Sequence, residues 1–103
     1  MKKSQITKKK VRDTKEWKQL RVDMAAEHNN LCALTKKRLL KGWNLHHLCM
    51  KESEYSNFSH DRFIPLNVSA HDCIHYLYRY YLKDKGILTR LKKILDDMVE
   101  FNN

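Results

Sequence analysis

The chain has 103 residues, and its 21 Lys and Arg residues outnumber its 12 Asp and Glu residues, so its formal net charge is +9. This length allows one small domain with a limited core. A hydrophobic content of 42% excludes a wholly disordered chain. Because only 2 Gly and 1 Pro are present, a turn-rich β-sandwich is disfavoured, and we expect helices joined by a few loops.

Strands are expected in the middle of the chain. Residues 39–48 roughly alternate apolar and polar side chains, which is typical of a strand, and residues 51–61 form a polar stretch that predicts a loop. Residues 63–66 are apolar, and their Pro65 allows only an edge strand or the end of a strand.

Helices are expected on both sides of these strands. Apolar spacing predicts one helix over residues 13–28, and a capping box that begins at Ser69 predicts a second helix that starts at Ala70. Gly86 breaks the pattern, and residues 87–101 form a last amphipathic helix. Its apolar stripe fits core packing against the other helices or, as an alternative, a partner interface. Together the elements predict a single α+β domain over residues 13–103.

Positive charge is concentrated near the N-terminus. Residues 1–21 hold nine Lys or Arg and two acidic residues, about +7 of the total, and we expect residues 1–12 to form a flexible basic arm. Such clusters usually bind a polyanion, most often nucleic acid, although a solvated tail has the same composition. A membrane surface is less favoured because the arm lacks interleaved large apolar residues. The candidate contacts to nucleic acid in the arm and in a second basic cluster are Lys8, Lys9, Lys10, Lys36, Lys37 and Arg38.

No apolar segment approaches the length of a membrane span, and the N-terminus lacks the apolar core of a signal peptide. We therefore expect neither a transmembrane protein nor a secretory precursor. The three cysteines, Cys32, Cys49 and Cys73, form no C-x-x-C pair. A disulfide scaffold and an all-cysteine zinc site are thus unsupported, and a reducing cytoplasm is the expected compartment.

Four histidines form two groups that could meet at one metal ion. His71 and His75 lie four residues apart on a predicted helix, so they project from one face. His46 and His47 are neighbours on a predicted strand and point to opposite faces, so one can join the helix pair while the other faces a substrate. Three neutral imidazoles suit Zn, Ni, Co or Mn better than Ca and leave coordination positions open. The alternative is a polar cluster hydrogen-bonded in a small core.

Three segments together resemble the motif of the HNH endonucleases, also called the ββα-metal finger. They are Leu-His-His-Leu at 45–48, Asp-Arg-Phe-Ile-Pro-Leu at 61–66 and His-Asp-Cys-Ile-His at 71–75. The arrangement is most similar to the colicin-type branch, in which a His-His pair precedes H-x3-H. The resemblance covers about residues 31–77 and implies two short antiparallel strands and a helix around one ion, flanked here by the N- and C-terminal helices. A small phage or mobile-element protein of the host bacterial cytoplasm is implied as well.

The resemblance also implies roles for individual residues. His46, His71 and His75 occupy the positions of the metal ligands for one divalent ion, which would be Zn, Ni, Mn or Mg. His47 occupies the position of the general base that would deprotonate a water molecule for attack on a phosphodiester. Arg79, further along the same helix, could contact backbone phosphates or be solvated.

The chain departs from the family pattern at two places. Where the family usually has an Asn whose amide pins the loop that orients the base, this chain has Arg62. Asn67 or Asn57 could supply the amide from a shifted position, or Arg62 could hold a phosphate. The second departure is the loss of the family's zinc knuckle, since Thr35 stands at the position of its second cysteine.

The function expected from the resemblance is that of a metal-dependent HNH-type DNA endonuclease, which nicks or cuts with low sequence preference. The alternative is a degenerate HNH fold that binds DNA or a host protein without cleavage, for example a phage-encoded inhibitor. A small zinc-stabilised binding domain is a third hypothesis. A two-fold homodimer through the last helix would suit a double-strand cut.

Overall fold

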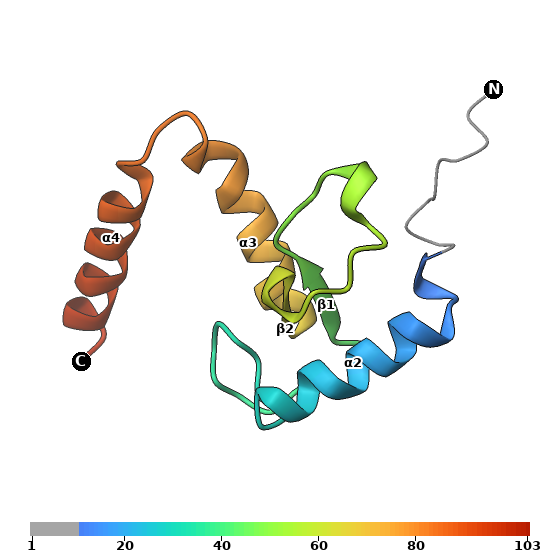
Figure 1. Cartoon of the computed structure of the whole chain (residues 1–103). Helices are drawn as coiled ribbons and strands as arrows, with labels where there is room; N and C mark the ends of the chain where they lie inside the picture. Colours follow the sequence, from blue (N-terminus) through green and yellow to red (C-terminus); the bar gives the residue numbers. More distant parts are fainter. Residues whose placement is uncertain (1–10) are drawn as a thin grey trace. The chain divides into compact units, whose positions relative to one another are not determined.

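The computed structural model of the chain describes residues 11–103 (Figure 1). Residues 1–10, and with them Lys8, Lys9 and Lys10 of the expected basic arm, lie outside the described residues. The described residues form three α-helices and one two-stranded antiparallel sheet, so the predicted α+β class is confirmed. Contacts group them into two units that divide between His71 and Asp72.

Helix α2 spans Lys15–Glu27, slightly shorter than the predicted 13–28. It begins where the hydroxyl of Thr14 accepts a hydrogen bond from the backbone N–H of Trp17 at 3.1 Å, which satisfies one of the N–H groups left open at a helix start. The three buried residues of the helix, Trp17, Leu20 and Met24, recur at helical spacing and lie on one face. This face anchors the core of the first unit.

Strands β1 (Asn44–His47) and β2 (Phe63–Leu66) pair antiparallel, with His46 opposite Ile64. β1 is shorter than the predicted 39–48. Pro65 fits the sheet because both strands are edges, as predicted for a residue that cannot donate a backbone hydrogen bond. The carbonyl of Pro65 accepts a hydrogen bond from the N–H of Ala33 at 2.9 Å.

The core of the first unit lies between α2 and one face of the sheet. Val11 is only 3% exposed, so part of the segment expected to be a flexible arm is packed in the core. Trp43 and Phe58 are half-buried against this cluster. The buried members of the cluster are Val11, Trp17, Leu20, Met24, Leu45, Tyr55 and Phe63.

Helix α3 spans Val68–Tyr81 and runs through the division between the two units. It begins two residues before the predicted Ala70 because the first helical hydrogen bond runs from the N–H of His71 to the carbonyl of Asn67, at 2.9 Å. Ser69 therefore lies inside the helix, and the predicted capping box does not mark its start.

Helix α4 spans Ile87–Phe101, and its predicted bounds are confirmed. None of its residues is buried. Within the described part of the chain, no helix has the length and apolar character needed to cross a bilayer.

Candidate functional site

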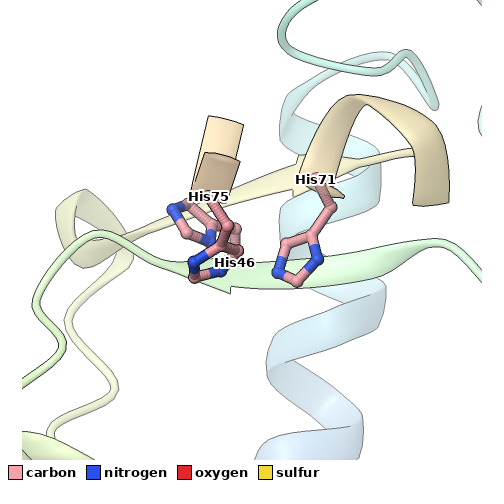
Figure 2. A group of neighbouring side chains, drawn as sticks. All are labelled: His46, His71 and His75. Atoms are coloured by element: carbon pink, nitrogen blue, oxygen red, sulfur yellow. The ribbon is translucent and has the colours of Figure 1, made fainter. Parts of the chain in front are cut away.

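Three histidines meet between strand β1 and helix α3. His46 projects from β1, while His71 and His75 lie one turn apart on α3, and each offers one ring nitrogen to a group whose ligand atoms all lie within 4.8 Å of one another. Figure 2 shows the three imidazole rings gathered together, one from the strand and two from the helix. The structure therefore brings together the three residues predicted as metal ligands.

Local geometry explains why these three side chains meet. Residues four apart on a helix share a face, which places His71 beside His75. Alternate residues of a strand point to opposite faces, and the register that pairs His46 with Ile64 directs His46 away from the α2 core. The His46 and His71 ring centroids are 5.2 Å apart with the rings nearly perpendicular, and His46 is only 7% exposed.

The donor set fits a divalent transition-metal ion. Imidazole nitrogens bound at about 2.1 Å to one tetrahedral ion lie about 3.4 Å apart, and small side-chain rotations bring ligand atoms within 4.8 Å of one another to that spacing. Nitrogen donors favour Zn, Ni, Co or Cu over Mg or Ca, which prefer oxygen ligands. Three protein ligands leave at least one position for water or a phosphate oxygen, as in catalytic rather than closed structural sites.

His47 points to the opposite face of β1, as the strand alternation predicts, and packs among aromatic rings. Its imidazole is stacked on the indole of Trp17, with centroids 5.3 Å apart and an angle of 14° between the planes. The rings of Tyr55 and Phe63 lie at 5.2 and 5.0 Å. The Nε2 atom of His47 is buried. His47, the residue predicted as the general base, is thus half-buried against these aromatic rings, on the opposite face of β1 from His46.

Arg62 joins the two ends of the loop between the strands. Its guanidinium forms an ion pair with Glu54 at 2.8 Å, and its carbonyl accepts a hydrogen bond from the N–H of Leu48 at 2.8 Å. Glu54 belongs to the 3-10 helix Glu52–Glu54, and Arg62 ends the 3-10 helix His60–Arg62. Arg62 therefore restrains the loop that follows His47. Asn57 lies in the same loop and donates to Glu54 at 3.3 Å.

Asn67 pins a different segment of the chain. Its side-chain oxygen accepts a hydrogen bond from the N–H of Leu40 at 2.7 Å, and its amide donates to the carbonyl of Arg38 at 2.9 Å. These bonds fasten the segment that follows the basic residues 36–38 to the residue before α3. Asn67 thus positions a loop through its amide, although this loop is not the one that carries His47.

Cys32 lies in the turn closed by an isolated bridge between Leu31 and Arg38, and its side chain is fully buried. Burial raises the pKa of the Cys32 thiol, but hydrogen bonds from the Thr35 hydroxyl and from the backbone of Thr35, Asn67 and Leu34 outweigh this effect and lower its pKa to about 7. All three cysteines of the chain are free thiols. Hydrogen bonds to the Cys32 sulfur therefore contribute to holding this turn.

A basic groove, formed by two adjoining cavities, lies beside Trp43 in the first unit. Two adjoining cavities of about 540 and 380 Å³ share Asn30 and Trp43, and Lys18, Arg21 and Arg38 line them without any acidic residue. The guanidinium of Arg21 lies 3.8 Å from the centroid of the Trp43 ring and donates to the Trp43 carbonyl at 2.9 Å. This groove offers cations, amides and an aromatic ring, which is the chemistry that binds nucleic acid.

The other predicted nucleic-acid contacts are exposed. Lys36, Lys37 and Arg38 lie on the turn between Leu31 and Arg38, and only Arg38 lines the groove. Arg79 lies on α3 with its guanidinium 5.5 Å from the Tyr76 ring centroid.

Lys18 and Arg21 belong to the basic residues 1–21 but are not singled out from the sequence as contacts to nucleic acid, and Trp43 is not predicted there. Lys18 and Arg21 are three residues apart beside the buried face of α2. Their spacing in the sequence indicates that they lie on the same side of the helix. Trp43 is brought to them only by the tertiary fold.

No family model, no curated protein and no solved structure matches the chain.

Proposed function

We propose that the chain is a metal-dependent nuclease of the ββα-metal kind, which hydrolyses phosphodiester bonds in DNA. The convergence of His46, His71 and His75 supports this proposal most directly. The two strands come first, the helix follows, and the ligands lie on β1 and α3, which is the order that the resemblance to HNH endonucleases implies.

His46, His71 and His75 would hold one divalent cation. When bound, such an ion neutralises charge on a phosphodiester and lowers the pKa of a coordinated water. The imidazoles are neutral ligands, so they leave the positive charge of the ion available to the substrate. Arg62 and Asn67 act as positioning residues in this proposal, because their contacts are to the chain itself.

The groove beside Trp43 supports nucleic acid as the substrate class. Lys18, Arg21 and Arg38 supply positive charge for the phosphates, and the aromatic side chain of Trp43 lines both cavities beside them. Base or sugar contacts to such a ring need no particular sequence, and phosphate contacts carry no sequence information. The proposal therefore includes low sequence preference.

The packing of His47 limits what is proposed for it. Its stacking on Trp17 and its contacts with Tyr55 and Phe63 support a structural role, while the role of general base rests on the resemblance. A base that acts on a water at the triad would have to reach the opposite face of β1. We therefore propose the nuclease without assigning the proton transfer to His47.

A supercoiled-plasmid assay tests the proposal. Protein stripped with a chelator is supplied with Mg, Mn, Ni or Zn one at a time, and His75→Ala is compared with His60→Gln. His60 is an exposed histidine outside the triad that pairs with Glu27, so it is the matched control. We expect metal-dependent nicking by the wild type and by His60→Gln and none by His75→Ala. Equal nicking by all three proteins would refute the proposed site.

A second candidate function is DNA binding without cleavage, as in a degenerate HNH fold. It is favoured by the packed His47 ring and by the engagement of Arg62 with Glu54. Plasmid that stays intact with every metal, together with retained binding of metal and DNA by the folded protein, would select this function over the nuclease.

A further inference from the structure

Apolar side chains follow one face of the C-terminal helix α4, and most of them are exposed. Its side chains Leu88, Leu95 and Met98 are 47, 50 and 56% exposed, although their spacing is that of a helix packed against another element. Ile94 and Phe101 continue the same face at 56 and 87% exposure. Scattered single apolar residues are normal on a surface, but a continuous stripe marks an interaction surface.

The charges of α4 are sorted along its length. Arg90, Lys92 and Lys93 lie in the N-terminal half, and the three acidic residues, Asp96, Asp97 and Glu100, lie in the C-terminal half. The first turn has no acidic residue and the last turn has no basic residue. This order opposes the helix macrodipole, which favours acids at the N-terminus and bases at the C-terminus.

The ion pairs within the helix follow the same unfavourable order. Lys92 pairs with Asp96 at 2.7 Å and Lys93 pairs with Asp97 at 2.6 Å, so in both pairs the base lies N-terminal to the acid. At this spacing the reverse order stabilises an isolated helix better. This order of charges thus destabilises the helix on its own. Beside a second helix that runs in the opposite direction the order is favourable, because basic residues then lie next to acidic ones.

A second copy of the same helix has this property. In an antiparallel pair related by a two-fold axis, the basic half of each α4 lies beside the acidic half of the other, and the two macrodipoles oppose each other. The six charged residues of the helix sum to zero, whereas the whole chain carries +9. A neutral surface with an acidic half is poorly suited to a polyanion or to an anionic membrane.

We infer that α4 is the contact surface of an antiparallel homodimer, in which the two apolar stripes pack together and the sorted charges pair across the interface. This inference does not depend on the metal site or on nuclease activity. It assigns a role to the exposed apolar side chains of α4.

Sedimentation equilibrium of the full chain with two charge-reversed variants tests the inference. The Lys92→Glu, Lys93→Glu variant has an α4 with only Arg90 as a base, and the Asp96→Lys, Asp97→Lys variant has an α4 with only Glu100 as an acid. We expect the wild type to be dimeric and each variant alone to be monomeric, with association weakened at least about tenfold, because like charges then face each other. An equimolar mixture of the two variants should form a heterodimer, which also shows that both remain folded.

A second pair of variants tests the apolar stripe. Leu95→Glu places a charge in the middle of the stripe, whereas Thr89→Glu adds the same charge at an exposed polar position of the same helix. The expected result is a monomeric Leu95→Glu and a dimeric Thr89→Glu. A wild type that stays monomeric at every concentration overturns the inference, and so do charge-reversed variants that each dimerise as well as the wild type or a mixture that stays monomeric.

Discussion

The imidazole of His47 lies parallel to the indole of Trp17, with 5.3 Å between the ring centroids and 14° between the ring planes. This stack joins strand β1 to helix α2 through the residue next to metal-ligand candidate His46. The four-residue strand β1 therefore presents neighbouring histidines to opposite faces: His46 belongs to the triad, and His47 packs against Trp17. His46 and His47 are neighbours with identical side chains. We expect replacement of His46 to affect metal binding and replacement of His47 to affect packing.

Replacement of His47 should separate packing from proton transfer. His47→Ala removes contacts with three aromatic rings, and we expect it to lower the free energy of unfolding by about 1–3 kcal/mol. His47→Phe keeps an aromatic ring in the same place and should lose less than about 1 kcal/mol. Urea unfolding followed by circular dichroism measures both changes.

The same two variants bear on catalysis. If His47 has only a packing role, His47→Phe retains metal-dependent nicking of plasmid DNA while His47→Ala loses activity in proportion to its unfolded fraction. A folded His47→Phe protein that binds metal but does not cleave would instead assign the general base to His47.

Loss of one ligand should weaken metal binding. We expect His46→Ala, His71→Ala and His75→Ala each to reduce the affinity for Zn or Ni by at least about tenfold, because two imidazoles hold such ions less well than three. Isothermal titration calorimetry measures the change, and His60→Gln should bind metal as tightly as the wild type. An unchanged affinity in any folded alanine variant would remove that residue from the ligand set.

These predictions depend on features that the sequence reveals to different extents. His71 and His75 could be paired from the sequence because their relation is local to one helix. The doublet was predicted to face two ways, but which histidine joins the triad depends on the strand register that places His46 opposite Ile64. That register is set by contacts between segments far apart in the chain.

The groove beside Trp43 could not be predicted from the sequence, because it too depends on contacts between segments far apart in the chain. Arg21 and Trp43 are 22 positions apart, and no periodic pattern relates a helix residue to a residue in the turn before a strand. The stripe of α4 was visible from its spacing, yet spacing alone does not say whether a stripe meets the same chain or another one. The bounds of α4 were predictable because Gly86 precedes a strongly amphipathic run.

Removal of Arg21 should weaken binding to nucleic acid. Arg21→Ala deletes the guanidinium that stacks on Trp43 in the groove, and we expect weaker binding of DNA and a salt dependence that corresponds to about one fewer phosphate contact. Fluorescence anisotropy with a labelled duplex at several salt concentrations measures both. Lys51→Ala removes one positive charge from an exposed residue outside the groove and should leave the salt slope closer to that of the wild type. Equal slopes for the two variants would show that the groove is not the contact.

The stability of the protein should rise with pH through the titration of Cys32. Hydrogen bonds to its sulfur lower the pKa of the thiol to about 7 in the folded protein, below its value in the unfolded chain. Between pH 7 and the unfolded value of about 8.5–9, the unfolded state binds more protons, so the free energy of unfolding increases with pH there and this contribution is lost as pH falls through 7.

Thr35→Val tests this titration because it removes the hydroxyl that donates to Cys32 while keeping the shape of the side chain. The increase in unfolding free energy, on the order of 2 kcal/mol for the wild type, should become smaller in the variant. Urea unfolding in the presence of a reducing agent at pH 6.5–9 gives both profiles. Superimposable profiles would show that Cys32 does not titrate in this range.

The placement of the two tryptophans gives the protein two intrinsic optical reporters. Trp17 emits from the core beside His47, one residue away from His46 of the triad, and Trp43 emits from the groove beneath the Arg21 guanidinium. With Trp43→Phe, fluorescence would come from Trp17 alone and would follow the state of strand β1 as metal is added. With Trp17→Phe, it would follow the groove as DNA is added. Occupancy of the ion site and of the nucleic-acid surface can thus be read separately, without an attached dye.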